Sequence, residues 1–135
     1  MFTGKTKNLG VIGNPIVHSL SPVLQNAALA CAGLDYAYIA MPVQSSALAD
    51  AVQGIRALGF RGVNVTIPHK TAIMPLLDAI DEDARMIGAV NTVVNNDGHL
   101  TGYNTDVLGF MDALLEKGFM PEGKTAVLLG AGGAA

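Results

Sequence analysis

The chain has 135 residues, of which 50% are hydrophobic and 14% charged, and its formal net charge is −3. This length fits one main domain with a substantial core, and the sparse charge argues against nucleic acid or anionic lipid as a partner. The three histidines and the single cysteine lack zinc-ligand spacing, so we expect no metal site.

The first residues lack the apolar core of a signal peptide, and no apolar run approaches membrane-spanning length. We therefore expect a cytoplasmic protein with no membrane segment. The lone Cys31 lies in an alanine-rich run and is expected to be a small buried residue. A single thiol also fits a reducing compartment.

Strand-like and helix-like segments alternate along the chain, which is typical of a largely parallel α/β sheet. In chain order we expect strand 9–12, helix 21–32, strand 36–41, helix 46–58, strand 62–67, a helix from residue 69 that Pro75 splits, helix 81–87, strands 90–94 and 99–103, helix 105–117 and strand 124–129.

Side chains suited to capping stand at several predicted helix starts, where Ser21, Ser46 and Thr105 are the expected N-caps. The run Asn96-Asp97-Gly98 is the strongest hairpin signal, so strands 90–94 and 99–103 should pair antiparallel. We therefore predict an α/β three-layer sandwich whose mixed, mostly parallel sheet lies within residues 9–103.

The last residues resemble the start of a nucleotide-binding unit, because strand 124–129 runs into the glycine-rich turn 130–135. Such a turn normally precedes a helix whose N-terminus holds a phosphate. We interpret residues 124–129 as the first strand of a Rossmann-type domain and the sequence as the front part of a longer protein. The expected division is a substrate-binding domain at 1–104, a connecting helix and linker at 105–122, and the beginning of a dinucleotide-binding domain at 123–135.

Residues 64–70, Asn-Val-Thr-Ile-Pro-His-Lys, place a lysine where a predicted strand ends. In open α/β sheets, ligands bind beyond the carboxyl ends of strands. Asn64 and Thr66 are two residues apart in the strand and should face the same side. The alternatives are that Lys70 covers the sheet edge with its stem, and that Asn64 and Thr66 are polar residues of an edge strand.

Three further polar clusters lie at strand ends or helix starts. Ser19 and Ser21 can donate to a carboxylate at a helix N-terminus, although capping alone explains Ser21. For Asn91 the alternative is that it satisfies turn backbone, and Asp106 suits the first turn of any helix. If Asp106 approaches Lys70, however, the pair can move a proton at a hydroxyl or carbonyl group.

Taken together and in order, five segments resemble the shikimate dehydrogenase family. The resemblance covers essentially the whole chain, and an ordered match of five motifs is specific. The segments are His-Ser-Leu-Ser-Pro at 18–22, Asn-Val-Thr-Ile-Pro-His-Lys at 64–70, Gly-Ala-Val-Asn-Thr at 88–92, Gly-Tyr-Asn-Thr-Asp at 102–106 and Gly-Ala-Gly-Gly-Ala at 130–134.

The resemblance implies reduction of 3-dehydroshikimate to shikimate with NADPH as cofactor, in aromatic amino-acid biosynthesis. It implies that Ser19 and Ser21 bind the substrate carboxylate and that Lys70 transfers the proton, paired with Asp106. Residues implied to hold ring hydroxyls are Asn64, Thr66, Asn91 and Asp106. Residues implied to contact the cofactor are Glu82, Gly130, Ala131, Gly132, Gly133 and Ala134.

The family's cofactor domain continues beyond the residues present here. We therefore expect the 135-residue chain to bind no dinucleotide and to be inactive alone. A small-molecule substrate and association into a homodimer complete the expected partners.

Three other interpretations stay open at this point. One is a quinate/shikimate dehydrogenase that uses NAD or NADP, because the residues deciding the cofactor are absent. A second is a domain that senses a pathway metabolite without converting it, against which the retained Lys70 and Asp106 argue. A third is another dehydrogenase of similar architecture, such as a folate enzyme, which the paired serines and residues 64–70 disfavour.

Overall fold

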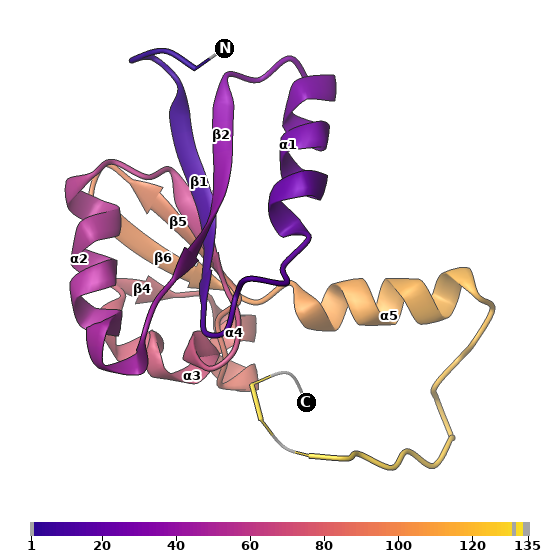
Figure 1. Ribbon diagram of the computed structural model, residues 1–135. Coiled ribbons are helices and arrows are strands. Elements are labelled where there is room, and N and C mark those ends of the chain that lie inside the picture. Colours follow the sequence, from indigo (N-terminus) through magenta and orange to yellow (C-terminus); the bar gives the residue numbers. More distant parts are fainter. Residues whose placement is uncertain (1, 131, 134–135) are drawn as a thin grey trace.

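Helices and strands alternate in a computed structural model that describes residues 2–130, 132 and 133 (Figure 1). The strands are β1 Lys7–Gly13, β2 Tyr36–Pro42, β3 Gly62–Val65, β4 Ala79–Ile80, β5 Thr92–Asn96 and β6 His99–Tyr103. The helices are α1 Ser21–Cys31, α2 Leu48–Ala57, α3 His69–Ala72, α4 Glu82–Ile87 and α5 Asp106–Glu116, with 3₁₀ turns η1 Ser45–Ala47 and η2 Met74–Leu76.

The six strands form one mixed sheet in the order β2-β1-β3-β5-β6-β4. β1 pairs parallel with β2 and β3, and β4 pairs parallel with β6. β5 runs antiparallel to both of its neighbours, β3 and β6. Three of the five pairings are therefore parallel, which confirms the predicted mixed, mostly parallel sheet.

The hairpin between β5 and β6 closes through two residues in the left-handed region, Asp97 at φ 52° and Gly98 at φ 95°. A type I′ turn needs positive φ at both central residues, and its twist matches that of the flanking strands. Asn96 pairs with His99 across the turn. The antiparallel pairing predicted from this turn is confirmed.

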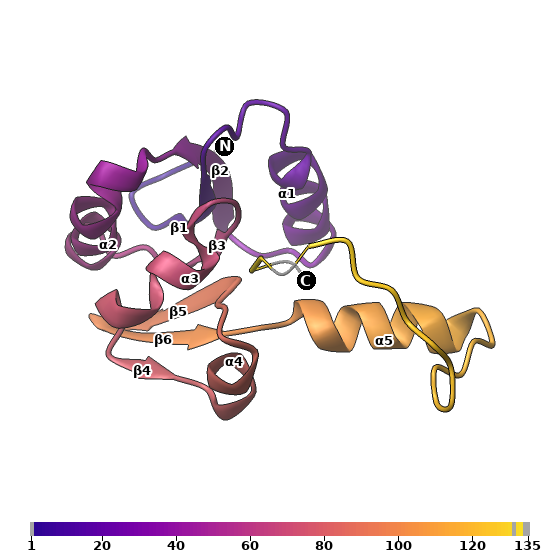
Figure 2. The same ribbon diagram turned by 90° about the horizontal axis from the view of Figure 1, so that it is seen from below.

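Neighbouring residues of β1 point into two separate apolar cores. Ile12 packs with Val52, Val65 and other residues on the face that α2 covers. Val11 packs with Tyr38 on the opposite face, beside α1. Because successive strand residues alternate between faces, one strand serves both cores. The result is the predicted three-layer sandwich, with α1 and α2 on opposite sides of the sheet (Figure 2).

Of the three predicted N-caps, two differ from the observed ones and Thr105 is at the predicted position. Ser21 is the first residue of α1 after an N-cap at Leu20, and Ser46 lies inside η1. Thr105 stands at the N-cap of α5, but its side chain makes no capping hydrogen bond. Asn104 accepts the Asp106 amide hydrogen at 2.9 Å instead. The Thr105 hydroxyl is engaged by another side chain, which local capping preference cannot anticipate.

The predicted strand 124–129 is wrong for this structure. These residues take no strand conformation, and Val127 and Leu129 are 82% and 99% exposed. A strand is stable only when a neighbour completes its hydrogen bonds, and no described strand lies beside this segment. Conversely, the two-residue strand β4 was not predicted from the sequence. It forms because it can pair in parallel with β6 on the side away from β5.

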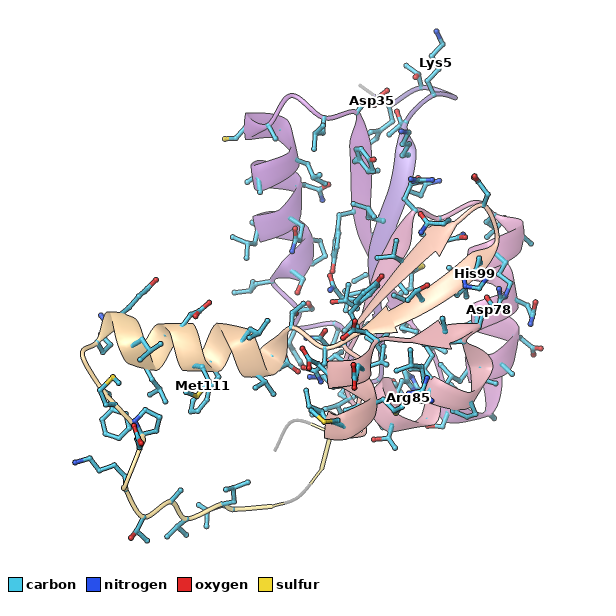
Figure 3. All side chains as sticks on the ribbon, turned by 180° about the vertical axis from the view of Figure 1, so that it is seen from behind. Lys5, Asp35, Asp78, Arg85, His99 and Met111 are labelled. Carbon is cyan, nitrogen blue, oxygen red and sulfur yellow. The ribbon has the colours of Figure 1, made fainter. Side chains whose placement is uncertain are left out.

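Two segments expose more apolar surface than expected. Within the described residues α1 buries no side chain, and Cys31, expected in the core, is exposed. α5 extends away from the sheet in both ribbon views, and Leu108 and Phe110 on it are 62% and 66% exposed (Figures 1 and 2). Figure 3 shows α5 from behind, with Met111 marked.

Candidate functional site

The topology gathers four chain segments at one end of the sheet. β1 and β3 are parallel, so their carboxyl ends lie together, and Ser19 and Lys70 follow these ends. β5 is antiparallel to β3 and β6 to β5, so the start of β5 and the end of β6 lie there too. Asn91 precedes β5 and Asp106 follows β6, so both residues lie at this same end of the sheet, which we call the site edge.

Lys70 and Asp106 form an ion pair at this edge. The Lys70 Nζ donates to Asp106 Oδ2 at 2.5 Å, and the side chains are 13% and 47% exposed. Lys70 is the second residue of α3, and its carbonyl accepts the Val90 amide hydrogen at 2.8 Å. Asp106 is the first residue of α5, where the helix dipole favours a carboxylate. The proximity on which the proton-transfer hypothesis depended is present.

Asn91 fixes the other oxygen of the Asp106 carboxylate. Its Nδ2 donates to Asp106 Oδ1 at 2.8 Å and to Thr105 Oγ1 at 2.9 Å. Its Oδ1 accepts from Thr92 Oγ1 at 2.9 Å and from the Thr105 amide at 3.1 Å. Both amide hydrogens of Asn91 are therefore used, and a ligand hydroxyl that accepts from Asn91 must replace one of these partners.

Asn64 continues the same network on β3. Its Nδ2 lies 3.4 Å from the Asn91 carbonyl and 3.2 Å from Thr92 Oγ1. Its Oδ1 accepts a 2.7 Å hydrogen bond from the Tyr38 hydroxyl. Burial raises the pKa of Tyr38 to about 12, so this hydroxyl stays a donor at neutral pH.

The remaining predicted substrate residues lie outside this network. The Ser21 amide donates to Ser19 Oγ at 3.3 Å, and both serines are partly buried at the start of α1. Thr66 lies beside the end of β1, since a Cβ on Gly13 would come within 2.5 Å of its methyl group. No hydrogen bond in the described part of the chain joins these three residues to Lys70.

Two cavities adjoin the site. One of about 280 Å³ is lined by Lys70 together with Ile67, Pro68, Thr71, Gly132 and Gly133. The other, of about 180 Å³, lies over the strands and is lined in part by Tyr38, Asn64 and Thr92. Neither of these two cavities is lined by all of the predicted substrate-binding residues.

The glycine-rich turn passes close to Lys70. A Cβ on Gly133 would lie 3.0 Å from Lys70 Cβ, so a side chain there would crowd Lys70. Gly130 has φ +114°, a backbone conformation that suits glycine. Of the predicted cofactor residues, Ala131 and Ala134 lie outside the described residues. Glu82 is exposed at the first residue of α4, which contributes nothing to the cavity beside Lys70.

Sequence reasoning missed several members of the network. Asn104 is 8% exposed, donates to the Ala89 carbonyl at 3.0 Å and caps Asp106. Thr92 and Thr105 lie within the recognised motifs, and their hydroxyls bond to Asn91. One signal could have indicated Tyr38. It lies within the predicted strand 36–41, and a tyrosine hydroxyl buried in a sheet usually needs a hydrogen-bond acceptor.

The described residues include neither a candidate metal site nor a membrane-spanning helix. They contain no group of three or more His, Cys, Asp or Glu side chains able to hold a metal ion. None of the helices described is long and apolar enough to cross a membrane.

The profile of the family described as "Shikimate dehydrogenase substrate binding domain" matches residues 11–93. The chain belongs to this family. It is 58% identical over 135 residues to the shikimate dehydrogenase (NADP(+)) of Geobacter metallireducens, an alignment that covers 99% of this chain and 47% of that protein. The chain thus spans about half the length of the curated relatives that it matches.

Solved structures of the family agree with this assignment. A shikimate 5-dehydrogenase from Listeria monocytogenes, in complex with shikimate and NAD, is 51% identical with a TM-score of 0.90, covering 98% of this chain and 46% of that one. The ligand-free 5-ketofructose reductase of a Gluconobacter strain is 42% identical with a TM-score of 0.85, covering 98% and 47%. The family fold therefore occurs in proteins named for different substrates.

Proposed function

We propose that this chain is the substrate-binding part of an NADP-linked shikimate dehydrogenase, which reduces 3-dehydroshikimate to shikimate. The observation that carries the proposal is the Lys70–Asp106 ion pair, held by Asn91 at the edge of the sheet where ligands bind in open α/β folds. The reaction is inferred from the names of the relatives. Lys70, held in this pair, is the group that we propose transfers the proton.

In the proposed reaction, Lys70 donates a proton to the substrate carbonyl oxygen as that oxygen becomes a hydroxyl. The Lys70 ammonium is the acid because it is largely buried and aimed by Asp106 Oδ2. The other oxygen of Asp106 accepts a hydrogen bond from Asn91 Nδ2, which restrains rotation of the carboxylate away from Lys70. In the reverse reaction, the Lys70 amine accepts the hydroxyl proton.

The remaining residues bind and orient the substrate in this proposal. Ser19 and Ser21, at the start of α1, hold the carboxylate. Asn64 has one lone pair free on Oδ1 after accepting from Tyr38, while its two amide hydrogens have partners, so it accepts from a ring hydroxyl. Thr66 and Asn91 complete the hydroxyl contacts.

The glycine-rich turn fits a dinucleotide cofactor, because any side chain at Gly133 would fill the space against Lys70. Gly130, Gly132 and Gly133 would hold NADP from this chain, with Glu82 as a further predicted contact. When bound, this cofactor supplies the hydride. The proposed domain division is 1–104 for substrate binding, 105–122 as connector and 123–135 as the start of the cofactor domain. Association into a homodimer stays a prediction.

A second candidate is reduction of an uncharged polyhydroxy ketone. It is favoured by the likeness to the protein named 5-ketofructose reductase. The two candidates differ at Ser19 and Ser21, because only an acid substrate needs donors for a carboxylate.

The test is a chimera that joins residues 1–129 to the second half of the Geobacter metallireducens relative. We expect NADPH oxidation with 3-dehydroshikimate and little with 5-ketofructose, and Ser19→Ala should raise KM for the acid substrate alone. Preferred turnover of 5-ketofructose would reject the first candidate. Turnover of neither substrate by a folded chimera would reject both.

A further inference from the structure

We propose that Tyr38, which lies outside the predicted site residues, is a positioning residue for the hydroxyl-binding side of the site. Its phenol group holds the Asn64 amide and, through Thr92 and Asn91, steadies the carboxylate of Asp106. This inference rests on the proposed function for its ligand, shikimate, but the hydrogen-bond network that carries it is independent of any ligand.

The hydrogen bonds from Tyr38 to Asp106 all point in one direction. Asn64 Nδ2 faces the Asn91 carbonyl, which can only accept, so Asn64 Oδ1 must face the Tyr38 hydroxyl and accept from it. Thr92 Oγ1 accepts from Asn64 and donates to Asn91 Oδ1. Asn91 then donates to Asp106. A chain of this kind has one consistent arrangement, and each bond polarises the next.

Tyr38 makes the shortest bond to Asn64. The hydroxyl lies 2.7 Å from Asn64 Oδ1, whereas Asn64 Nδ2 lies 3.2 and 3.4 Å from its two acceptors. Tyr38 is 5% exposed, so water competes little for this bond. Without the hydroxyl, only the two longer bonds would hold the Asn64 side chain.

The backbone of Tyr38 is tied to the helix that carries the serines. The Asn26 side chain on α1 accepts the Tyr38 amide hydrogen at 2.9 Å and donates to the Tyr38 carbonyl at 2.8 Å. Asn26 Nδ2 also lies 2.7 Å from the Pro22 carbonyl, in the first turn of α1. Tyr38 therefore links the start of α1, near Ser21, to Asn64 on β3. Tyr38 thus helps to set the distance between the proposed carboxylate contacts on α1 and the proposed hydroxyl contacts on β3.

The first test is NMR of the ¹⁵N-labelled, ligand-free 135-residue chain. Tyr38→Phe should shift the side-chain amide signals of Asn64 most and those of Asn91 less. The matched control is Tyr36→Phe, on the same face of β2, whose hydroxyl makes no hydrogen bond with the described residues. It should leave both signals in place. Unmoved Asn91 signals in a folded Tyr38→Phe protein would overturn the proposal.

Thr92→Val is the second variant, and it removes a hydroxyl in the middle of the chain of bonds. It should shift the Asn91 amide signals while the Tyr38 hydroxyl stays bonded to Asn64. This variant tests the chain of hydrogen bonds between Asn64 and Asn91 even if Tyr38→Phe does not fold. Unchanged Asn91 signals after loss of the Thr92 hydroxyl would show that this chain of hydrogen bonds does not hold Asn91.

The last test is a shikimate titration of the same proteins, followed by amide shifts. Loss of one buried hydrogen bond is expected to weaken shikimate binding about tenfold in Tyr38→Phe, with no change in Tyr36→Phe. Equal affinity in the two variants would overturn the positioning role. If the unsubstituted chain shows no shikimate-dependent shifts, the two variants are compared by their KM for 3-dehydroshikimate in the chimera, whose turnover tests the proposed function separately, and the ligand-free spectra still decide the role of Tyr38.

Discussion

Lys70 and Asp106 lie 36 positions apart in the chain, yet their Nζ and Oδ2 atoms are 2.5 Å apart. They lie in the first turns of two different helices, α3 and α5, which start at the same end of the sheet. Lys70 is largely buried and Asp106 is half exposed, so the carboxylate fixes the position of the Lys70 ammonium group at the end of the sheet. This arrangement underlies the proposed reaction.

The first prediction concerns Lys70 in the chimera described above. Lys70→Ala should lower kcat by about a hundred- to ten-thousand-fold with little change in KM, because the proton-transfer group is lost. Lys70→Arg should not restore turnover, since a guanidinium group stays protonated. Lys117→Ala, at the exposed end of α5, is the control and should behave as the unsubstituted chimera. Near-normal kcat in Lys70→Ala would limit Lys70 to substrate positioning.

The second prediction is a pH dependence of stability that arises at Asp78. Hydrogen bonds from Arg56 and from the Leu100 amide hold the pKa of Asp78 below its usual range. A carboxyl group whose folded pKa is depressed stabilises the fold above its unfolded pKa of about 3.9, and this contribution is lost as pH falls through the folded value. Figure 3 shows Asp78 near His99, at the hairpin that it supports.

Thermal unfolding of Asp78→Asn at several pH values tests this. Its midpoint should lie below that of the unsubstituted chain at pH 7, and the gap should shrink as pH falls below about 4. Asp112→Asn removes an exposed carboxylate of α5 and should give no such pH-dependent gap. A gap for Asp78→Asn that stays constant down to pH 2 would contradict the assignment.

The third prediction compares two glycines. A Cβ at Gly62 would lie 2.5 Å from the Val93 carbonyl oxygen, where β3 pairs with β5, so Gly62→Ala should destabilise the fold by about 1–3 kcal/mol. A Cβ at Gly54, inside α2, would meet nothing within 4 Å. Gly54→Ala should therefore stabilise the fold by about 1 kcal/mol. Urea unfolding measures both, and effects of the same sign would refute the contact at β3.

The fourth prediction is that the 135-residue chain alone binds shikimate no more tightly than about millimolar. The Asp106 side chain is 47% exposed, so its hydrogen bonds to a ligand compete with water and contribute about 1 kcal/mol each. The cost of ordering the ligand offsets much of that gain. We also expect no dinucleotide binding and no turnover. Calorimetric titration is the measurement, and micromolar shikimate binding would contradict the prediction.

Local chemistry of the chain was enough to predict much of the fold. The hairpin follows from Asn96-Asp97-Gly98, because left-handed residues at the turn fix the antiparallel pairing. The alternation of strands and helices predicts the mixed sheet, and the order of the motifs predicts the family. The positions of Lys70 and Asp106 at a strand end and a helix start also suggested that the two could meet.

The tertiary structure alone decided which side chains bond to one another. Asn91 reaches Thr105 and Asp106, and Tyr38 reaches Asn64, across strands whose order is not written in any local pattern. The predicted strand 124–129 has an apolar sequence but no neighbour among the described residues, so its hydrogen bonds have no partner. Turns and caps depend on a few adjacent residues, whereas strand pairing and side-chain networks depend on distances that only the folded chain sets.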